Sequence, residues 1–580
     1  MMRIIRHAGL WVGLWFLLWG GIGSALSADV YEVEFQKNVM VSMSDGIHLA
    51  ANLFLPKADG PFPVLLMRSP YGKGDEKMGD CLFYGGQGYA VMIQDTRGRG
   101  DSEGEWNPFF LDGRDGYETQ EWIGKQTWCN GKIGTFGGSY VGFTQWISAP
   151  FASQYLKAMV PEVPFSDAYH HINYQGGAYQ VALTFLWGTM VSKDLPKPFE
   201  VKWDEGFRHL PLMGWKDYLG FEVKYINDWL SHPTYDDYWK ARGVDNRYGD
   251  ITVPILNIGG WYDIFARDTI DMINRVRHES KDHAARRNQL VIMGPWHHGG
   301  SDKGKVGELD FGRDADLDRR PLRLKWFDYW LKNQDTGVED WPPFYLFIMG
   351  ENVWRSENEW PLQRTQWTDY YLHSGGKANT RQGDGVLNTV PPLVEESDTF
   401  VYDPADPVPS KGGNHLGNPV PGPFEQSEVE NRQDVLVYTT PALEHDVEVT
   451  GPIKMVLFAS STATDTDFTA KLVDVHEDGK AFNLCDGIIR ARYRSSETEA
   501  SLIESGKIYR YEIDLWVTSN LFRQGHRIRV EISSSNFPRF DRNPNTGHTF
   551  AVDADMVKAT QAVLHGAEYP SHLVLPVIPR

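Results

Sequence analysis

Residues Lys132–Trp146 read KIGTFGGSYVGFTQW, and this stretch decides how the chain is interpreted. Ser139 stands between small residues, after a short apolar run and before residues with a helical pattern. A strand that turns into a helix within so few residues forces the serine into a strained backbone conformation, which only neighbours such as Gly137 and Gly138 tolerate. The serine hydroxyl would then be exposed at a helix N-terminus, where backbone N–H groups can stabilise an oxyanion. The pattern predicts a nucleophile elbow, and the alternative is an ordinary Gly/Ser-rich turn.

The composition excludes some classes of partner. The 580 residues include 57 Lys and Arg and 77 Asp and Glu, which gives a net charge of −20. A phosphate-binding surface needs a basic patch, so this charge argues against nucleic acid and against an anionic membrane. A hydrophobic content of 41% and an aromatic content of 13% are ample for large cores. The length alone suggests roughly two to four domains.

The N-terminus has the pattern of a signal peptide. A basic start precedes an apolar run from Ala8 to Gly23, and the mostly small residues Ser24–Ala28 suit a signal-peptidase cut. The alternative is a membrane anchor, because the uncharged stretch is nearly long enough to span a bilayer. The small-residue end favours cleavage. We therefore expect residues 1–28 to be a signal peptide and the mature protein to be periplasmic or secreted, with no membrane attachment.

The cysteines give no sign of a disulfide scaffold or a zinc site. Cys81, Cys129 and Cys485 are too few for the former and are not spaced for the latter. A bond between Cys81 and Cys129 is an alternative in an oxidising compartment, but buried free thiols are the preferred interpretation. We expect neither a metal nor a cofactor.

Strands and helices alternate in the first part of the chain. The apolar runs Pro63–Met67 and Tyr89–Gln94 have the length of strands that are buried on both faces of a parallel sheet, and Gly116–Gly124 has a helical pattern. This alternation predicts an α/β fold, in which ligands bind at the carboxyl ends of the strands. Ser139 follows the predicted strand Ile133–Phe136 and therefore lies at such an end.

Two later strands deliver the partners that a nucleophilic serine needs. The apolar run Val253–Ile258 leads to Asp263, and the run Gln289–Met293 leads to His298. The order Ser139, Asp263, His298 is that of the catalytic triads of α/β hydrolases. A single Asp or His in a loop is usually structural, but three such residues in this order, each after a predicted strand, favour catalysis.

The remaining segments predict a cap and a second domain. Residues 165–250 are dense in aromatic residues at mostly helical spacing, which favours a helical cap inserted over the site, although many of these residues must be core. Asp403–Pro423 is rich in Gly and Pro and indicates a long ordered loop or linker. Short alternating strands beyond it predict an all-β sandwich or jelly roll. The expected domains are a catalytic domain at 29–365 and a β jelly roll at 366–580.

Taken together, these motifs make the chain resemble a known group of enzymes. It is similar to the cocaine-esterase-like and X-prolyl dipeptidyl-peptidase-like serine hydrolases, a group that includes α-amino acid ester hydrolases and some β-lactam acylases. The resemblance covers nearly the whole mature chain and implies an α/β-hydrolase domain, a helical cap and a C-terminal jelly roll. The motifs that carry it are RSPYGK (68–73), QDTRGRGDSEG (94–104), GGSYVG (137–142), GWYD (260–263), GPWHH (294–298) and LCDGIIRARY (484–493).

The resemblance implies a role for each site residue. Ser139 would be the nucleophile, His298 the general base and then acid, and Asp263 the residue that orients the imidazole and stabilises its charged form. The Tyr71 hydroxyl and the Tyr140 backbone N–H would form the oxyanion hole.

Two further expectations concern the surroundings of these residues. His297 competes with His298 for the base, and the pattern Gly-Pro-Trp-x-His favours His298. The charged motif from Asp95 to Asp101 is expected to fix loops near the site by ion pairs, not to take part in catalysis.

The chain departs from one branch of the group in an informative way. In the α-amino acid ester branch, acidic residues stand two and three positions after the triad Asp and bind the substrate ammonium, whereas this chain has Phe265 and Ala266. A buried ammonium needs a carboxylate partner, so selection for free α-amino groups is put in doubt. We expect an apolar acyl group, with Trp187, Trp261 and Phe265 lining the pocket.

Three functions are weighed against one another. The leading hypothesis is an exported serine hydrolase that cleaves small-molecule carboxylic esters, or amides, through an acyl-enzyme, with homo-oligomers left open. The alternative is an X-prolyl dipeptidyl aminopeptidase, or an α-amino acid ester hydrolase or β-lactam acylase, with Asp167, Asp204 or Glu205 as candidates to hold an amine. The third is a binding protein that uses the β domain. The complete triad argues against this last hypothesis.

Overall fold

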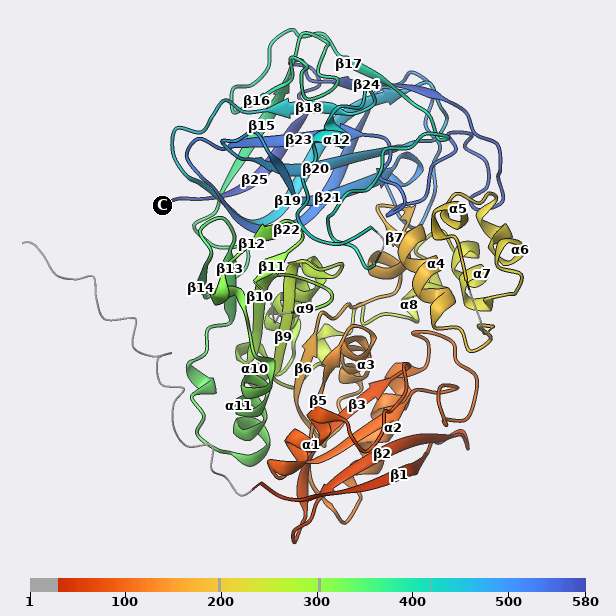
Figure 1. Cartoon of the computed structure of the whole chain (residues 1–580), viewed down its shortest axis with the longest axis vertical. Helices are drawn as coiled ribbons and strands as arrows, with labels where there is room; N and C mark the ends of the chain where they lie inside the picture. Colours follow the sequence, from red (N-terminus) through yellow and green to blue (C-terminus); the bar gives the residue numbers. More distant parts are fainter. Residues whose placement is uncertain (1–29, 197–199, 301–303, 418) are drawn as a thin grey trace, which may run out of the picture.

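The computed structural model describes residues 30–196, 200–300, 304–417 and 419–580. The predicted signal peptide at residues 1–28 lies outside these ranges. Within them, no helix combines the length and the apolar character that a membrane span requires. Figure 1 shows an α/β part, a group of short helices beside it and an all-β part at the other end of the molecule.

A ten-stranded sheet forms the centre of the α/β part, in the order β1-β2-β4-β3-β5-β6-β9-β10-β13-β14. The strands from β4 to β13 in this order run parallel, whereas β1, β2 and β14 pair antiparallel with their neighbours. The predicted α/β fold is confirmed. The strands are β1 (Val33–Ser42), β2 (His48–Pro56), β3 (Phe62–Ser69), β4 (Ala90–Asp95), β5 (Cys129–Gly138), β6 (Leu156–Glu162), β9 (Ile255–Tyr262), β10 (Gln289–His297), β13 (Phe344–Ile348) and β14 (Val353–Glu357).

Helices cover both faces of this sheet because its central strands are apolar on both sides. Every residue of β4 and of β9 is buried. Helices α1 (Gly79–Gly86) and α11 (Arg319–Lys332) pack into one apolar cluster, and α3 (Tyr140–Ser148) and α9 (Ala266–Glu279) pack into another. Two more helices complete this part, namely α2 (Asp112–Gly124) and α10 (His283–Arg287).

The three cysteines are free and buried, as the preferred interpretation of the sequence has it. Cys81 packs in the cluster that contains α1 and α11, whereas Cys129 packs in a separate cluster with residues of β1 and β2. The cysteines therefore serve as small apolar core residues.

The described residues of the segment 165–250 form the cap, a set of short helices and turns that contacts the loops at the carboxyl edge of the sheet. Many of its aromatic residues are core, since Trp215, Trp229 and Trp239 are fully buried. Its elements are a hairpin of β7 (Tyr174–Gln175) and β8 (Ala178–Tyr179), then α4 (Val181–Met190), α5 (Trp203–Phe207), α6 (Trp215–Leu219), α7 (Lys224–Ser231) and α8 (Asp237–Lys240).

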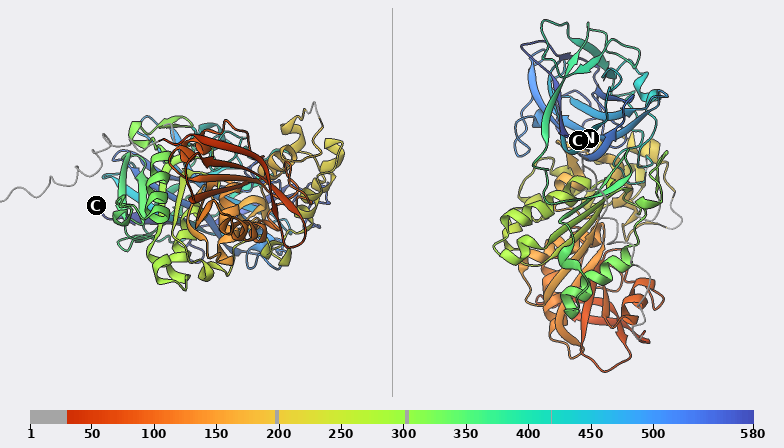
Figure 2. Two further views of the ribbon diagram at one scale, coloured as in Figure 1. Left: turned by 90° about the horizontal axis from the view of Figure 1, so that it is seen from below. Right: turned by 90° about the vertical axis from the view of Figure 1, so that its left-hand side faces the viewer.

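The C-terminal part is an all-β domain built on an eleven-stranded sheet, here called the β domain. Figure 2 shows it stacked on the end of the α/β part. Its strands are β15 (Gln366–His373), β16 (Val386–Asn388), β17 (Asp398–Tyr402), β18 (Leu436–Thr439), β19 (Val447–Ser461), β20 (Asp467–Val475), β21 (Ala481–Arg490), β22 (Tyr509–Phe522), β23 (Arg527–Ser533), β24 (Ala559–Leu564) and β25 (His572–Ile578). Helix α12 (Ser427–Glu430) lies within it, and a small hairpin of β11 (Lys305–Val306) and β12 (Leu309–Asp310) precedes it.

Buried polar contacts tie the cap to the β domain. Arg490 donates two hydrogen bonds of 2.9 Å to the Asp467 carboxylate and one of 2.8 Å to Asp541. Asp541 in turn accepts from the backbone N–H of Tyr179, in the cap hairpin. Breaking a buried ion pair is costly, because the remaining charge is left without a partner. The cap is therefore held from the β-domain side as well as from the sheet.

Candidate active site

Ser139 occupies the turn between β5 and α3 with a backbone that few residues other than glycine adopt, at φ 62° and ψ −126°. Its N–H donates to the carbonyl of Glu162 on the next strand at 3.0 Å. Gly137 has φ +123°, and a Cβ at that position would lie 2.4 Å from the Val141 side chain. The glycine is therefore needed for the turn to close, and the turn has the geometry of a nucleophile elbow.

His298 joins the serine to a carboxylate. The Ser139 hydroxyl lies 2.9 Å from His298 Nε2, and His298 Nδ1 lies 2.7 Å from Asp263 Oδ2. The second oxygen of Asp263 accepts from the Phe265 N–H at 2.7 Å, which fixes the carboxylate plane. Asp263 follows β9 directly and His298 follows β10, so two neighbouring parallel strands deliver the pair. Asp263 is fully buried, and a buried carboxylate with its oxygens occupied has a defined orientation.

His297 is placed differently from its neighbour. Its Nδ1 accepts the backbone N–H of Gly299 at 2.9 Å, and burial lowers the pKa of its imidazole. Only His298, of the two histidines, contacts both Ser139 and Asp263 among the hydrogen bonds of the described residues.

Tyr71 lies in the loop after β3, with its hydroxyl at the serine. The hydroxyl accepts a hydrogen bond from the Trp187 indole N–H at 3.1 Å, and the Ser139 side chain is within hydrogen-bonding reach. Although half of the residue's surface is exposed, desolvation raises the pKa of Tyr71. The hydroxyl therefore stays neutral near pH 7, and its proton is available to an acceptor at the site.

Tyr140 contributes both its backbone and its ring. It is the first residue of α3, where a backbone N–H has no acceptor within its own helix. Its buried hydroxyl donates to Asp112 Oδ2 at 2.6 Å and accepts from the Phe109 N–H at 2.9 Å. Sequence reasoning missed Asp112, because neither its spacing from Tyr140 nor a motif marks the pair. Asp112 anchors the first turn of the helix that follows Ser139.

The charged motif fixes loops near the site, as expected. Lys73 contacts Asp95 Oδ2 at 2.7 Å and Asp101 Oδ2 at 2.6 Å, so it ties the Tyr71 loop to the end of β4. Arg99 donates at 2.7 Å to the carbonyl of Pro70.

Arg99 also reaches the cap, where it donates at 2.7 Å to the carbonyl of Val191 just after α4. Its guanidinium lies 4.4 Å from the ring centroid of Trp106. Because Pro70 precedes Tyr71 and α4 carries Trp187, one arginine holds both segments that place the Tyr71 hydroxyl.

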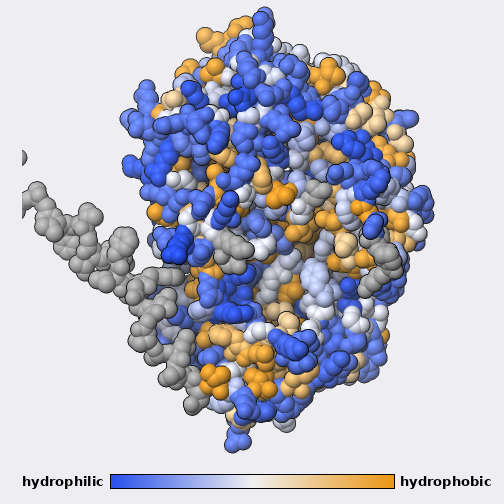
Figure 3. Space-filling view, viewed as in Figure 1, coloured by the Kyte–Doolittle hydropathy of each residue, from blue (hydrophilic) through white to orange (hydrophobic). Residues whose placement is uncertain are grey.

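Two of the three predicted pocket residues lie at the site. The Phe265 ring packs edge-on to the His298 imidazole at a centroid distance of 5.3 Å. The Trp187 ring stacks on Tyr140 at 6.0 Å and on Phe109 at 5.7 Å. Figure 3 shows hydrophobic side chains in the hollow between the cap and the sheet, below the β domain.

The structure corrects the prediction for Trp261. Its side chain is fully buried, its indole N–H donates to the Phe347 carbonyl at 2.8 Å, and its ring stacks on Trp360. Asp263 lies beyond the end of β9, where the chain turns, so its carboxylate and the Trp261 ring meet different neighbours although they are two residues apart. Trp261 is a core residue near the carboxyl end of β9, and the prediction that it lines the pocket was wrong.

Among the described residues, one group of side chains has the composition of a metal site. The ligand atoms of Asp474, His476 and His526 lie within 4.8 Å of one another, in the β domain. His526 already bonds Asp474 at 2.9 Å, and the two imidazole rings stack at 4.5 Å. His476 Nε2 lies 3.9 Å from the other oxygen of Asp474, so the carboxylate already pairs with both imidazoles.

Comparisons with known proteins place the chain in a class and then in a family. Residues 45–300 match the X-Pro dipeptidyl-peptidase (S15 family), and residues 336–574 match the X-Pro dipeptidyl-peptidase C-terminal non-catalytic domain. The chain is 40% identical to the cocaine esterase of Rhodococcus sp. strain MB1 Bresler, over 94% of this chain and 98% of the relative. The protein is therefore a serine hydrolase. It belongs to the family of cocaine-esterase-like and X-Pro dipeptidyl-peptidase-like enzymes, as the sequence motifs predicted.

Solved structures agree with this assignment. An aminopeptidase from a marine sediment Thaumarchaeota archaeon superposes with a TM-score of 0.82 at 25% identity, covering 96% of this chain and 98% of that one. An α-amino acid ester hydrolase superposes with a TM-score of 0.80 at 25% identity, covering 97% and 100%. The fold is thus shared by enzymes whose names describe both ester and peptide substrates.

Proposed function

We propose that this protein hydrolyses carboxylic esters through an acyl-enzyme, with Ser139 as nucleophile. The observation that carries the proposal is the pair of contacts at His298, 2.9 Å to Ser139 Oγ and 2.7 Å to Asp263. His298 takes the serine proton as the hydroxyl attacks the carbonyl carbon, and Asp263 stabilises the resulting imidazolium. The same proton then passes to the leaving alcohol, and water, deprotonated by His298, releases the acid.

The oxyanion of each tetrahedral intermediate needs donors that are already in place. The Tyr71 hydroxyl is within hydrogen-bonding reach of Ser139, the Tyr140 backbone N–H directly follows Ser139 in the chain, and both have a proton to donate. Such preorganised donors are worth more than equivalent donors in water, because they need no reorganisation as charge develops. Lys73 and Arg99 support this arrangement by holding the loop that carries Tyr71.

The acyl group that fits is apolar. Phe265 and Ala266 are both buried where a carboxylate pair would recognise an ammonium group, and Phe265 packs on the catalytic imidazole. Of the acidic residues considered for holding an amine, Asp167 is buried against His170, and Glu205 pairs with Lys202 at the surface. These contacts support an ester with an apolar acyl part over a peptide with a free N-terminus.

Replacing the nucleophile is the direct test. We expect Ser139→Ala to lower kcat for p-nitrophenyl butyrate at least about 10³-fold, since the activated hydroxyl has no substitute. The matched control is Ser231→Ala, which removes a surface hydroxyl that bonds only within α7. Steady-state rates at equal concentrations of folded protein decide the matter. Wild-type activity in Ser139→Ala would refute the proposed mechanism.

The oxyanion role of Tyr71 predicts a loss in kcat. Tyr71→Phe keeps the ring but removes the donor, and we expect kcat to fall about 10²- to 10³-fold. Tyr225→Phe is the control. The Tyr225 hydroxyl donates a hydrogen bond to the Gly188 carbonyl in the cap, and the residue belongs to the same aromatic cluster. Equal kcat values for Tyr71→Phe and wild type would remove Tyr71 from the oxyanion hole.

The acyl pocket predicts an order of substrates. We expect p-nitrophenyl butyrate to give a higher kcat/KM than phenylglycine methyl ester or Gly-Pro-p-nitroanilide, because the latter two carry an ammonium group, and Phe265 and Ala266 stand where a carboxylate pair would receive it. Parallel assays of the three compounds measure this. A preference for Gly-Pro-p-nitroanilide would favour the dipeptidyl aminopeptidase instead.

Export is part of the proposal and rests on the pattern of residues 1–28. A basic start, an apolar run and a small-residue end support removal near Asp29 during secretion. N-terminal sequencing of protein recovered from the producing cells and their medium tests this, and an intact Met1 terminus would contradict it.

A further inference from the structure

The backbone that presents the Asp263 carboxylate is hydrogen-bonded by a residue of the β domain. The Asn414 side-chain amide donates to the carbonyl of Trp261 and to the carbonyl of Asp263, both at 2.8 Å. A side-chain amide has two N–H groups, so both donors are used on one short segment of backbone. Asn414 is 2% exposed, which keeps water from competing for these carbonyls.

This segment of backbone decides where the Asp263 carboxylate lies. One carboxylate oxygen accepts from the Phe265 N–H two residues on, and the other faces His298. The side chain therefore turns with the local backbone. A shift of the Trp261–Asp263 carbonyls would move the oxygen that orients the imidazole. Contacts of this kind matter because a misplacement of about 1 Å can cost about 10²-fold in rate.

The loop that carries Asn414 is itself held rigidly in the β domain. Asn483, on β21, donates to the Gly422 carbonyl at 3.2 Å and accepts from the Phe424 N–H at 2.8 Å. The Gln426 amide donates to the Lys411 carbonyl at 2.9 Å and to Asn483 Oδ1 at 3.1 Å. The described residues of this stretch, which the sequence left as an ordered loop or linker, are thus tied to the β domain at Lys411 and at Gly422–Phe424.

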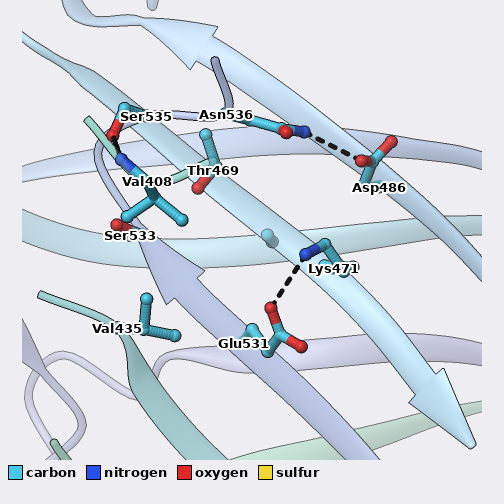
Figure 4. A pocket seen from close by; sticks show the side chains of 10 residues that line it. Val408, Val435, Thr469, Lys471, Asp486, Glu531, Ser533, Ser535 and Asn536 are labelled. Atoms are coloured by element: carbon cyan, nitrogen blue, oxygen red, sulfur yellow. Dashed lines mark hydrogen bonds and ion pairs between the residues drawn. The ribbon is translucent and has the colours of Figure 1, made fainter. Parts of the chain in front are cut away.

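The hydrogen bonds of Gln426 connect this loop to Lys471, a buried charged residue of the β-sheet. Lys471 donates to Gln426 Oε1 at 2.9 Å and to Glu531 at 3.0 Å. Figure 4 shows Lys471 and Glu531 facing each other across adjacent strands, beside a small polar cavity. The Tyr262 hydroxyl, next to Asp263 in the chain, donates to the Asn483 carbonyl at 3.3 Å. The side chain of Asn414 and the backbone carbonyl of Asn483 therefore both contact residues at the end of β9.

We propose that Asn414 is a positioning residue, through which the β domain holds the Asp263 backbone so that the carboxylate meets His298 in the reactive orientation. The inference rests on the proposed serine hydrolase mechanism and assigns the β domain a part in it. Asn414 itself touches neither substrate nor reacting atoms. Its effect passes through the hydrogen bond between Asp263 and His298.

The test is Asn414→Leu, which removes both donors at similar volume. We expect kcat for p-nitrophenyl butyrate to fall about 10- to 100-fold with KM within about threefold of wild type, because the chemistry and not the binding is disturbed. Asn414→Ala, which leaves room for water at the two carbonyls, serves if the leucine variant does not fold. Circular dichroism and thermal unfolding establish that each variant is folded.

The pH profile separates positioning from a general loss of structure. His298 is faced by the Asp263 carboxylate, the Ser139 hydroxyl, the Tyr71 hydroxyl and the neighbouring His297. Asp263 is the group whose charge stabilises the imidazolium, so its displacement weakens that stabilisation. We expect the acidic limb of kcat/KM to move to lower pH in the Asn414 variants.

The matched control is Asn379→Leu. Asn379 also donates to two carbonyls, those of Thr399 at 3.0 Å and Gln433 at 2.9 Å, but entirely within the β domain. It should leave kcat and the acidic limb unchanged. A wild-type kcat and pH profile in both Asn414 variants would overturn the inference, as would an equal loss in Asn379→Leu. Failure of the mechanism itself would appear separately, as an active Ser139→Ala enzyme.

Discussion

The site depends on one strained turn. Ser139 keeps a backbone conformation that costs about 1–3 kcal/mol for a residue with a side chain. Packing around it holds it there, because its N–H is bound to Glu162 on the adjacent strand and Gly137 leaves room for Val141. The turn points the hydroxyl outward and starts α3 at Tyr140, so one local constraint places both the proposed nucleophile and a proposed oxyanion donor.

The other site residues reach this turn from separate parts of the fold. Parallel strands bring Asp263 and His298 to the same edge of the sheet, because their carboxyl ends all lie there. The cap supplies Trp187, whose N–H binds the Tyr71 hydroxyl. Arg99 links the Tyr71 loop to the cap. The β domain reaches the same edge through Asn414.

Much of the fold and of the site could be predicted from the sequence, because the patterns involve residues close together in the chain. The α/β fold follows from apolar runs of strand length, and Ser139, Asp263 and His298 each follow such a run. Trp261 shows the limit of that reasoning. It is two residues from Asp263 and aromatic, yet its ring packs on Trp360, because contacts far along the chain decide what a side chain meets. Asp112 was missed for the same reason, since its partner Tyr140 is known only once α2 and α3 pack together.

By itself, the sequence determined the order of strands and helices, the turn at Ser139 and the absence of acidic residues two and three positions after Asp263, because each depends on residues close together in the chain. The sequence pattern also favoured His298 over His297. Only the tertiary structure decided that Trp187 and Phe265 lie at the site while Trp261 does not, and that Asn414 supports Asp263. These are contacts between segments far apart in the chain, and a hydrogen bond requires its two atoms to come within about 3 Å in the right direction. Spacing along one chain carries no such information.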